Sequence, residues 1–362
     1  MSAAIDTLAV PAPARVPQAA APPRRGSPGA ALLAPADRWR RRAFRLLGPL
    51  ARPYLASRES RVALLGAFTV AVAFAATALS PLWLLALSPL VFGVPHLLSD
   101  FRYLVVRRGL HRRPAVWLGI GVPLAAVSWH PTVAVGLTAV LGALVVARTD
   151  PWKRLLGLAL WAAATSAALS HARLAGFAFA HAHNLVALAL WWFWRPRRGR
   201  WHWLVLGLVG LATLAIFGGP ATTWAGAAAA AGGPSHHPDL GAFASAIAPF
   251  ADPALAWKCV LFFAFAQAVH YGVWLRLVPE DDRPRPAPRP FAASWRALRA
   301  ELGPVLLLAC GAVAVGLAVW GAFDLAAARD GYLRLAFFHG HLELAAAALL
   351  WAEGRRLDSA PA

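Results

Sequence analysis

The sequence predicts an all-α membrane protein, a polytopic bundle of about ten transmembrane helices. Three observations lead to this fold class. Of the 362 residues, 59% are hydrophobic and only 14% are charged, and long apolar runs alternate with short polar breaks along the chain. A soluble domain is nearer half apolar and about a quarter charged. The chain is therefore expected to contact the lipid bilayer over much of its surface.

Each predicted span is an apolar run close to the roughly 20 residues that cross a membrane as a helix. The third to fifth runs are near the lower length limit. The spans are expected at residues 62–80, 82–105, 114–130, 132–147, 154–170, 174–194, 203–219, 255–277, 302–322 and 332–352.

The charges between the spans predict the orientation. Counted from a cytoplasmic N-terminus, the inside loops are rich in arginine, whereas the long outside stretch 219–254 contains no lysine or arginine. This asymmetry follows the positive-inside rule and places both termini in the cytoplasm. The net charge of +19 is then explained by these loops, and no nucleic-acid partner is expected. Arginine and alanine usage is typical of a GC-rich bacterial genome, so the predicted location is the inner (cytoplasmic) membrane.

Three segments flank or interrupt the predicted bundle of residues 61–353. Residues 1–60 form a basic cytoplasmic segment: its Ala-, Pro- and Arg-rich beginning is expected to be disordered, and 38–58 has the composition of an amphipathic helix on an anionic membrane. Residues 218–254 are Gly/Ala-rich and predict an outer loop or re-entrant segment. Residues 354–362 predict a short cytoplasmic tail.

Histidines and other polar residues concentrate in four of the predicted spans. Such side chains are costly within a membrane and by default indicate function, although a single histidine there is more often an interhelical hydrogen-bond partner. The residues are His96 and Asp100 in the second span, His181, His183 and Asn184 in the sixth, Gln267, His270 and Tyr271 in the eighth, and His339, His341 and Glu343 in the tenth.

The spacing of these residues limits which of them can meet. His96 and Asp100 are four residues apart and share a helix face, as do His339 and Glu343. The pairs His181/His183 and His339/His341 are two residues apart, roughly 200° around a helix. Only one member of each pair is therefore expected at a common centre, unless the helix is distorted. Estimated depths place the two pairs about 10 Å nearer the outside than His96 and His270, which leaves two layers or one merged site.

Several neutral imidazoles in apolar surroundings favour a transition metal, because imidazole binds Fe, Cu, Zn and Ni and a carboxylate commonly orients its second nitrogen. The predicted metal ligands are His96, His181, His183, His270, His339 and His341, and the predicted catalytic and ligand-orienting acids are Asp100 and Glu343. Histidines without cysteine beside lipid suit Fe(II) and O₂ chemistry on a hydrophobic small molecule. Copper, or two bis-histidine haems, are the alternatives.

The stretch GVPHLLSD (93–100) resembles the G-[LIV]-P-H-x-x-x-D element of the Brp/Blh family of membrane β-carotene dioxygenases, although Leu97 stands where the family has glycine. The resemblance implies iron held by histidines from several helices, with His96 as the first ligand and Asp100 as its neighbouring acid. AFFHGHLELA (336–345) resembles the family's late helix, with His339 or His341 and Glu343 in the matching places. The specific match covers about eight residues, so it implies a related membrane metal enzyme more strongly than it implies carotene.

Three hypotheses follow from the sequence. The first is an iron-dependent oxygenase of a carotenoid-like or other hydrophobic substrate. The second is a haem- or metal-binding electron carrier or a proton-coupled transporter, in which the histidines are ligands or relay groups. The third is a structural protein of a membrane complex. Bound metal and an absorption spectrum distinguish them, because haem gives a Soret band and a proton-coupled transporter binds no stoichiometric metal.

Overall fold

The computed structural model describes residues 28–197, 199–230, 247–248, 252–284 and 286–355, and this part of the chain is helical with no strand. Seven of its helical runs are long and apolar enough to cross a membrane. The prediction of an all-α membrane bundle is therefore confirmed. Parts of the predicted segments 1–60, 218–254 and 354–362 lie outside the described residues.

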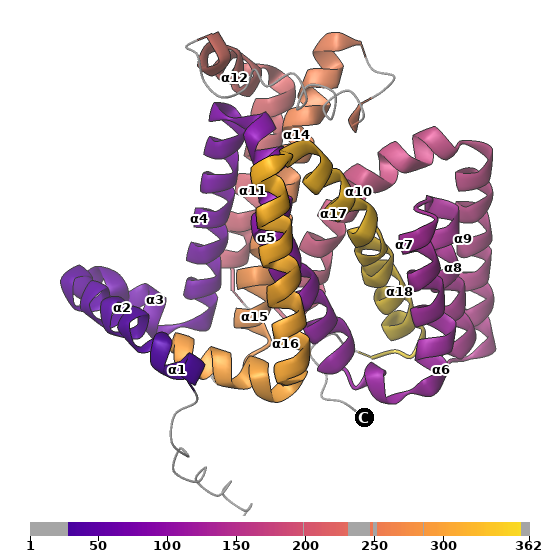
Figure 1. Ribbon diagram of the computed structural model, residues 1–362, viewed down its shortest axis with the longest axis horizontal. Helices are drawn as coiled ribbons and strands as arrows, with labels where there is room; N and C mark the ends of the chain where they lie inside the picture. Colours follow the sequence, from indigo (N-terminus) through magenta and orange to yellow (C-terminus); the bar gives the residue numbers. More distant parts are fainter. Residues whose placement is uncertain (1–27, 198, 231–246, 249–251, 285, 356–362) are drawn as a thin grey trace, which may run out of the picture.

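In the first half of the chain, short helices lead into two long ones and then into a group of shorter ones (Figure 1). The elements are α1 (Pro28–Leu32), α2 (Ala34–Leu47), η1 (Gly48–Ala51), α3 (Arg52–Ala56), α4 (Arg58–Leu79), α5 (Pro81–Asp100), η2 (Phe101–Val106), η3 (Leu110–Arg112), α6 (Pro114–Val116), η4 (Trp117–Gly121), α7 (Val122–Trp129), α8 (Val133–Val146) and α9 (Pro151–Ser170).

The second half contains most of the long helices. They are α10 (Ala172–Phe193), α11 (Trp201–Gly218), α12 (Pro220–Ala230), α14 (Pro253–Gly272), η6 (Val273–Leu277), α15 (Val278–Asp281), α16 (Phe291–Phe323), α17 (Leu325–Ala336) and α18 (Phe338–Ala352).

Helices lie at all ten predicted span positions, but they differ in length. The runs at Pro114–Trp129 and Val133–Val146 are apolar but shorter than the seven long ones. Helix α9 has 20 residues and begins with Lys153 and Arg154 in its first turn. The number of helices that cross the membrane, and the side on which the termini lie, stay predictions.

Helix α16 is broken near the start of its predicted span. Gly303 has φ of +77° and ψ of 160°, and Pro304 follows it. Glycine adopts this left-handed region without the Cβ penalty, and proline suits the first turn of the helix that resumes. The arm before the break is capped by Asp37 of α2, whose carboxylate accepts hydrogen bonds from the backbone of Phe291 and Ala292 (2.8 and 3.1 Å). This arm and α1–α3 lie at the same end of the bundle (Figure 1).

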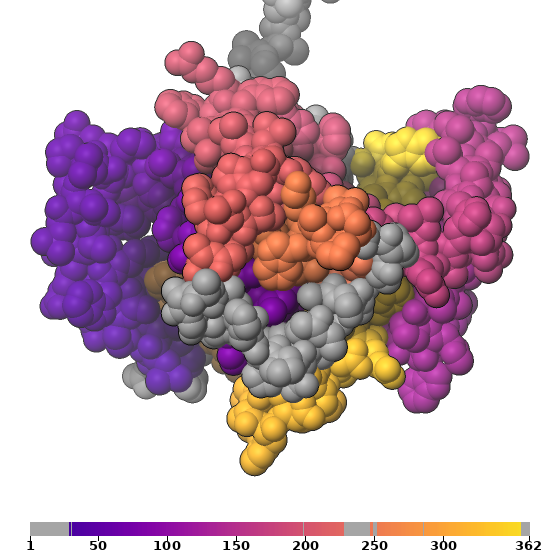
Figure 2. All heavy atoms as spheres, turned by 90° about the horizontal axis from the view of Figure 1, so that it is seen from above, coloured from indigo at the N-terminus to yellow at the C-terminus, as the bar shows by residue number. Residues whose placement is uncertain are grey.

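The centre of the bundle is formed by helices far apart in the sequence. Helix α5 packs against α4, α14, α16 and α17, and α18 packs against α7, α8 and α10. Viewed from the α12 end, α7–α10 form a lobe on one side, opposite α1–α4 (Figure 2). This arrangement places α5, α10, α14 and α18, the helices with the clustered histidines, around one interior space.

Three consecutive acids at the end of α15 bind arginines from other parts of the chain. These contacts tie the start of α4 and the segments that follow η2 and α10 to the end of α15. The pairs are Arg61–Glu280 (2.7 Å), Arg197–Asp281 (2.6 Å) and Arg108–Asp282 (2.8 Å).

Candidate metal centre

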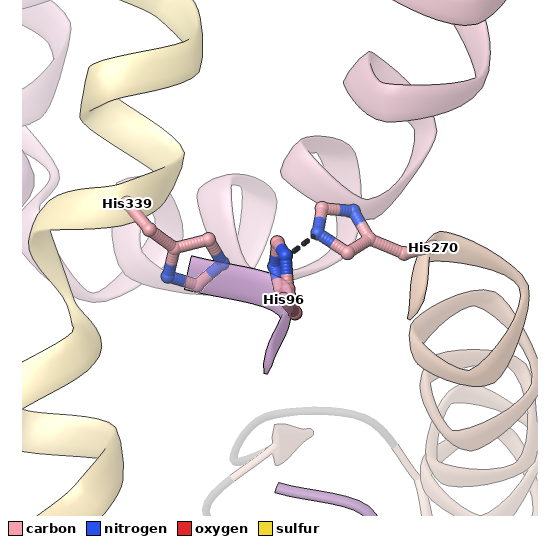
Figure 3. A group of neighbouring side chains, drawn as sticks. All are labelled: His96, His270 and His339. Atoms are coloured by element: carbon pink, nitrogen blue, oxygen red, sulfur yellow. Dashed lines mark hydrogen bonds between the residues drawn. The ribbon is translucent and has the colours of Figure 1, made fainter. Parts of the chain in front are cut away.

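Four histidines from four helices converge in the interior. They are His96 of α5, His183 of α10, His270 of α14 and His339 of α18. Ring centroids are 4.6 Å apart for His96 and His270, 4.9 Å for His96 and His339, 5.3 Å for His183 and His339, and 5.4 Å for His183 and His270. Figure 3 shows His96, His270 and His339 turned toward one another.

The ring nitrogens are spaced as donors to a single ion would be. The Nε2 atoms of His96 and His270 are 2.8 Å apart, and one nitrogen from each of His96, His270 and His339 lies within 4.8 Å of the other two. Two nitrogens about 2.1 Å from an ion and at right angles to each other are about 3.0 Å apart. The residues present therefore fit a metal ion.

The second nitrogen of two of these rings is held by its own helix. Nδ1 of His183 lies 3.0 Å from the carbonyl oxygen of Ala180, and Nδ1 of His339 lies 2.5 Å from that of Ala336. A carbonyl oxygen only accepts, so each Nδ1 carries the proton in the neutral imidazole. Nε2 of each ring then keeps its lone pair as a metal donor.

Two fully buried carboxylates lie beside the histidines. Oδ1 of Asp100 is 3.0 Å from Nδ1 of His96, the arrangement that the spacing of four residues predicts. Oε1 of Glu343 accepts a 2.7 Å hydrogen bond from Nε1 of Trp274 and is 3.6 Å from Nε2 of His270. Oxygens of Asp100 and Glu343 and a nitrogen of His96 lie within 4.8 Å of one another. Trp274 is a site residue that the sequence analysis did not identify.

Both helices that supply the closest pair of histidines change geometry just beyond them. Helix α5 continues as the π-helical η2 directly after Asp100, and α14 continues as the π-helical η6 directly after Gly272. Short π-helical segments occur often at functional sites. The hydroxyl of Ser99 donates a 2.6 Å hydrogen bond to the carbonyl oxygen of Trp274, which joins the end of α5 to η6. Nothing in the apolar pattern distinguishes a π turn from an α turn.

The other two predicted ligands lie elsewhere. Nδ1 of His181 is 3.0 Å from the carbonyl oxygen of Phe177, and its ring is nearly parallel to that of Phe262. His341 stacks on Phe179 with centroids 4.2 Å apart and faces Gly136, where any side chain would overlap its ring. The helices stay regular through both pairs. Because the two members of each pair are about 200° apart around the helix, only one of them points toward the cluster.

The ring contacts place the four clustered histidines in one layer, and the last span begins earlier than its predicted start at residue 332. Residues 325–331, which precede the predicted span, belong to α17, and the continuous run is Leu325–Ala352. His339 is then about 21 Å from the start of this run and His96 about 22 Å from the start of α5. The two estimated layers thus merge.

A cavity of about 430 Å³ reaches three of the clustered histidines, His183, His270 and His339. Its wall also includes aromatic rings, among them Phe177 and Phe179. This opening explains why His183 and His339 are only partly buried. A second cavity of about 340 Å³, lined by apolar residues of η4, α7 and α18, touches none of the four.

The chain matches no protein-family model, no curated protein and no solved structure. The resemblance of GVPHLLSD to the Brp/Blh element stays a prediction, and the function is inferred from the geometry of the site.

Proposed function

We propose that the chain is a membrane enzyme in which His96, His183, His270 and His339 hold one iron ion and which oxygenates a hydrophobic substrate. The observation that carries this proposal is the convergence of four imidazoles from four helices, with ring nitrogens of three of them within 4.8 Å. Imidazole is a preferred ligand of iron. Burial of several polar side chains inside an apolar bundle costs free energy, so a cluster of this kind indicates a functional site.

The charges around the cluster support a divalent ion. Asp100 and Glu343 are fully buried and their oxygens lie within 4.8 Å of each other. If both are ionised, two carboxylates so close in a low-dielectric interior repel strongly. No arginine or lysine within the described residues forms an ion pair with either acid. A divalent ion bound by neutral imidazoles brings two positive charges and balances both carboxylates.

The chain's own residues have distinct parts in the proposed reaction. The histidines hold the ion, Asp100 orients His96 through Nδ1, and Trp274 orients Glu343 beside His270. The aromatic cavity wall holds the substrate and excludes water. When bound, Fe(II) would supply the redox chemistry that O₂ activation requires. In a dioxygenase reaction both oxygen atoms enter the product, so no separate reductant is needed.

The geometry argues against haem. A bis-histidine haem has its flat ring between two axial nitrogens. The Nε2 atoms of His96 and His270 are at hydrogen-bonding distance, 2.8 Å, and each of the other two rings of the cluster has its centroid within 6 Å of that of His270. A porphyrin has no room between them. Copper shares the donor preference of iron, and metal analysis separates the two.

A second candidate function, a proton-coupled transporter, is favoured by one specific observation. Asp100, His96, His270 and Glu343 form a continuous chain of polar contacts, with successive distances of 3.0, 2.8 and 3.6 Å. Proton relays through membranes use such chains of acids and histidines. This alternative predicts that the folded protein binds no stoichiometric metal.

Metal analysis and an absorption spectrum of the purified protein test the proposal. We expect iron in a ratio of about one per chain without a Soret band. His270→Ala should lose the iron, and His181→Ala, which changes a histidine outside the cluster, should keep it. A folded wild-type protein that takes up no iron or copper would overturn the metal-enzyme proposal and favour the relay.

A further inference from the structure

The cavity that reaches the histidines is lined by two unlike sets of residues. Its lining includes aromatic residues of α10 and α14 and, besides them, polar groups from α14 and α17. Tyr271 accepts a 2.9 Å hydrogen bond from the amide of Gln267. Tyr332 packs so closely on Gly93 that no side chain fits there. A purely apolar ligand would not need these polar groups.

The charges in the cavity wall favour an anion. Arg329 of α17 is 4% exposed and lines the cavity, and its Nε donates a 3.0 Å hydrogen bond to the carbonyl oxygen of Leu85. A guanidinium keeps its positive charge when buried. Arg173, which is exposed, lines the same cavity, and Asp330, the one acid among the lining residues that the structure describes, is paired with Arg334 at 3.2 Å.

Arg329 and the clustered histidines are separated along the direction of α5. Leu85, which accepts the hydrogen bond from Arg329, precedes His96 by eleven residues on α5. At the rise of an α-helix this separation is on the order of 16 Å along α5. A ligand that spans this distance thus meets positive charge at one end and imidazoles at the other.

We propose that this cavity takes an amphiphile with a compact anionic head, a long-chain carboxylate, whose head binds at Arg329 and whose chain extends to His183 and His339. Arginine presents a fork of donors that matches a carboxylate. The aromatic wall contacts the chain. The oxidation of that chain rests on the proposed function, but binding of the acid does not. A hydrocarbon without a polar end gains nothing from the charge of Arg329.

Binding of a fluorescent conjugated polyene acid, cis-parinaric acid, tests this inference on the full-length protein in detergent. Its methyl ester and the phosphate monoester of the matching alcohol serve as comparison ligands. We expect the acid to bind at least about tenfold more tightly than the neutral ester, since a hydrogen bond to a charged group contributes that much. Equal affinities for acid and ester would overturn the proposal. Tighter binding of the phosphate ester than of the acid would support an anionic head and identify it as a phosphate.

Variants locate the head group. The acid-to-ester ratio should fall to about one in Arg329→Gln and be kept in part in Arg329→Lys. It should be unchanged in Arg276→Gln, which removes the same charge from an exposed position outside the cavity. An unchanged ratio in Arg329→Gln would overturn the assignment. If that variant fails to fold, the ratio in the wild type still decides whether the head is anionic.

Iron content measured on the same samples separates this inference from the metal proposal. Acid selectivity in a protein that binds no metal would support the cavity assignment and overturn the metal centre. Bound iron without any acid selectivity would support the metal centre and overturn the cavity assignment.

Discussion

Nδ1 of His96 lies 3.0 Å from Oδ1 of Asp100, one helical turn further along α5. Both residues are fully buried and belong to the stretch GVPHLLSD. Nε2 of the same imidazole lies 2.8 Å from Nε2 of His270. The contact of His96 with Asp100 is therefore a local property of one helix, whereas the rest of the cluster depends on how four helices pack.

Asp100→Ala should weaken metal binding, because residues that orient ligating histidines typically contribute 10–100-fold to affinity. Asp100→Asn should weaken it less, since an amide oxygen can still accept from Nδ1. Competition with a chelator measures the affinity. Asp150→Asn, at an exposed loop position, is the matched control and should bind like the wild type. Equal affinities in all four proteins would refute the orienting role.

The two histidine pairs give an internal comparison. His183→Ala and His339→Ala should lose the metal, whereas His181→Ala and His341→Ala should retain it, because the latter two rings pack on Phe262 and Phe179 and not on the clustered histidines. Metal content is the readout, and thermal unfolding shows whether each variant is folded. Loss in the reverse order would mean that the helices present their other face to the site.

Gly142→Ala should destabilise the fold. A Cβ at Gly142 of α8 would overlap the backbone carbonyl oxygen of Gly119 in η4. Because backbone cannot move aside as a side chain can, we expect a loss of about 1–3 kcal/mol in unfolding free energy. Gly207→Ala on α11 meets no atom within 4 Å and should be neutral or slightly stabilising. Unfolding in mixed detergent compares them, and similar stabilities for both would contradict the close packing.

Nε of Arg61 and Oε1 of Glu280 form a buried pair 2.7 Å apart. Replacing one partner should destabilise the fold more than replacing both. Arg61→Met leaves a buried carboxylate with one remaining partner, Arg283, and should cost about 3 kcal/mol. The double variant Arg61→Met/Glu280→Met should recover part of this loss. Additive effects of the two single substitutions would show that the pair is not coupled.

The sequence was sufficient for the helices and for half of the site. Apolar runs place helices at every predicted position, and the spacing of His96 and Asp100 predicts their contact. Of the two predicted arrangements, two layers or one merged site, the structure has the merged one. The start of the last span was misplaced, because Arg329, Asp330 and Arg334 lower the hydropathy of a segment that is helical. Which histidine of each pair faces the cluster depends on helix rotation, and the contact of Trp274 with Glu343 depends on η6. Neither follows from hydropathy.

X-ray absorption at the iron edge of the purified, iron-loaded protein shows whether the clustered histidines bind the metal. We predict about one iron per chain with four imidazole nitrogens as ligands, and the loss of this signal in variants of His96, His183, His270 and His339. A protein that is folded but binds no iron, or an iron site that persists unchanged in all four variants, would contradict it.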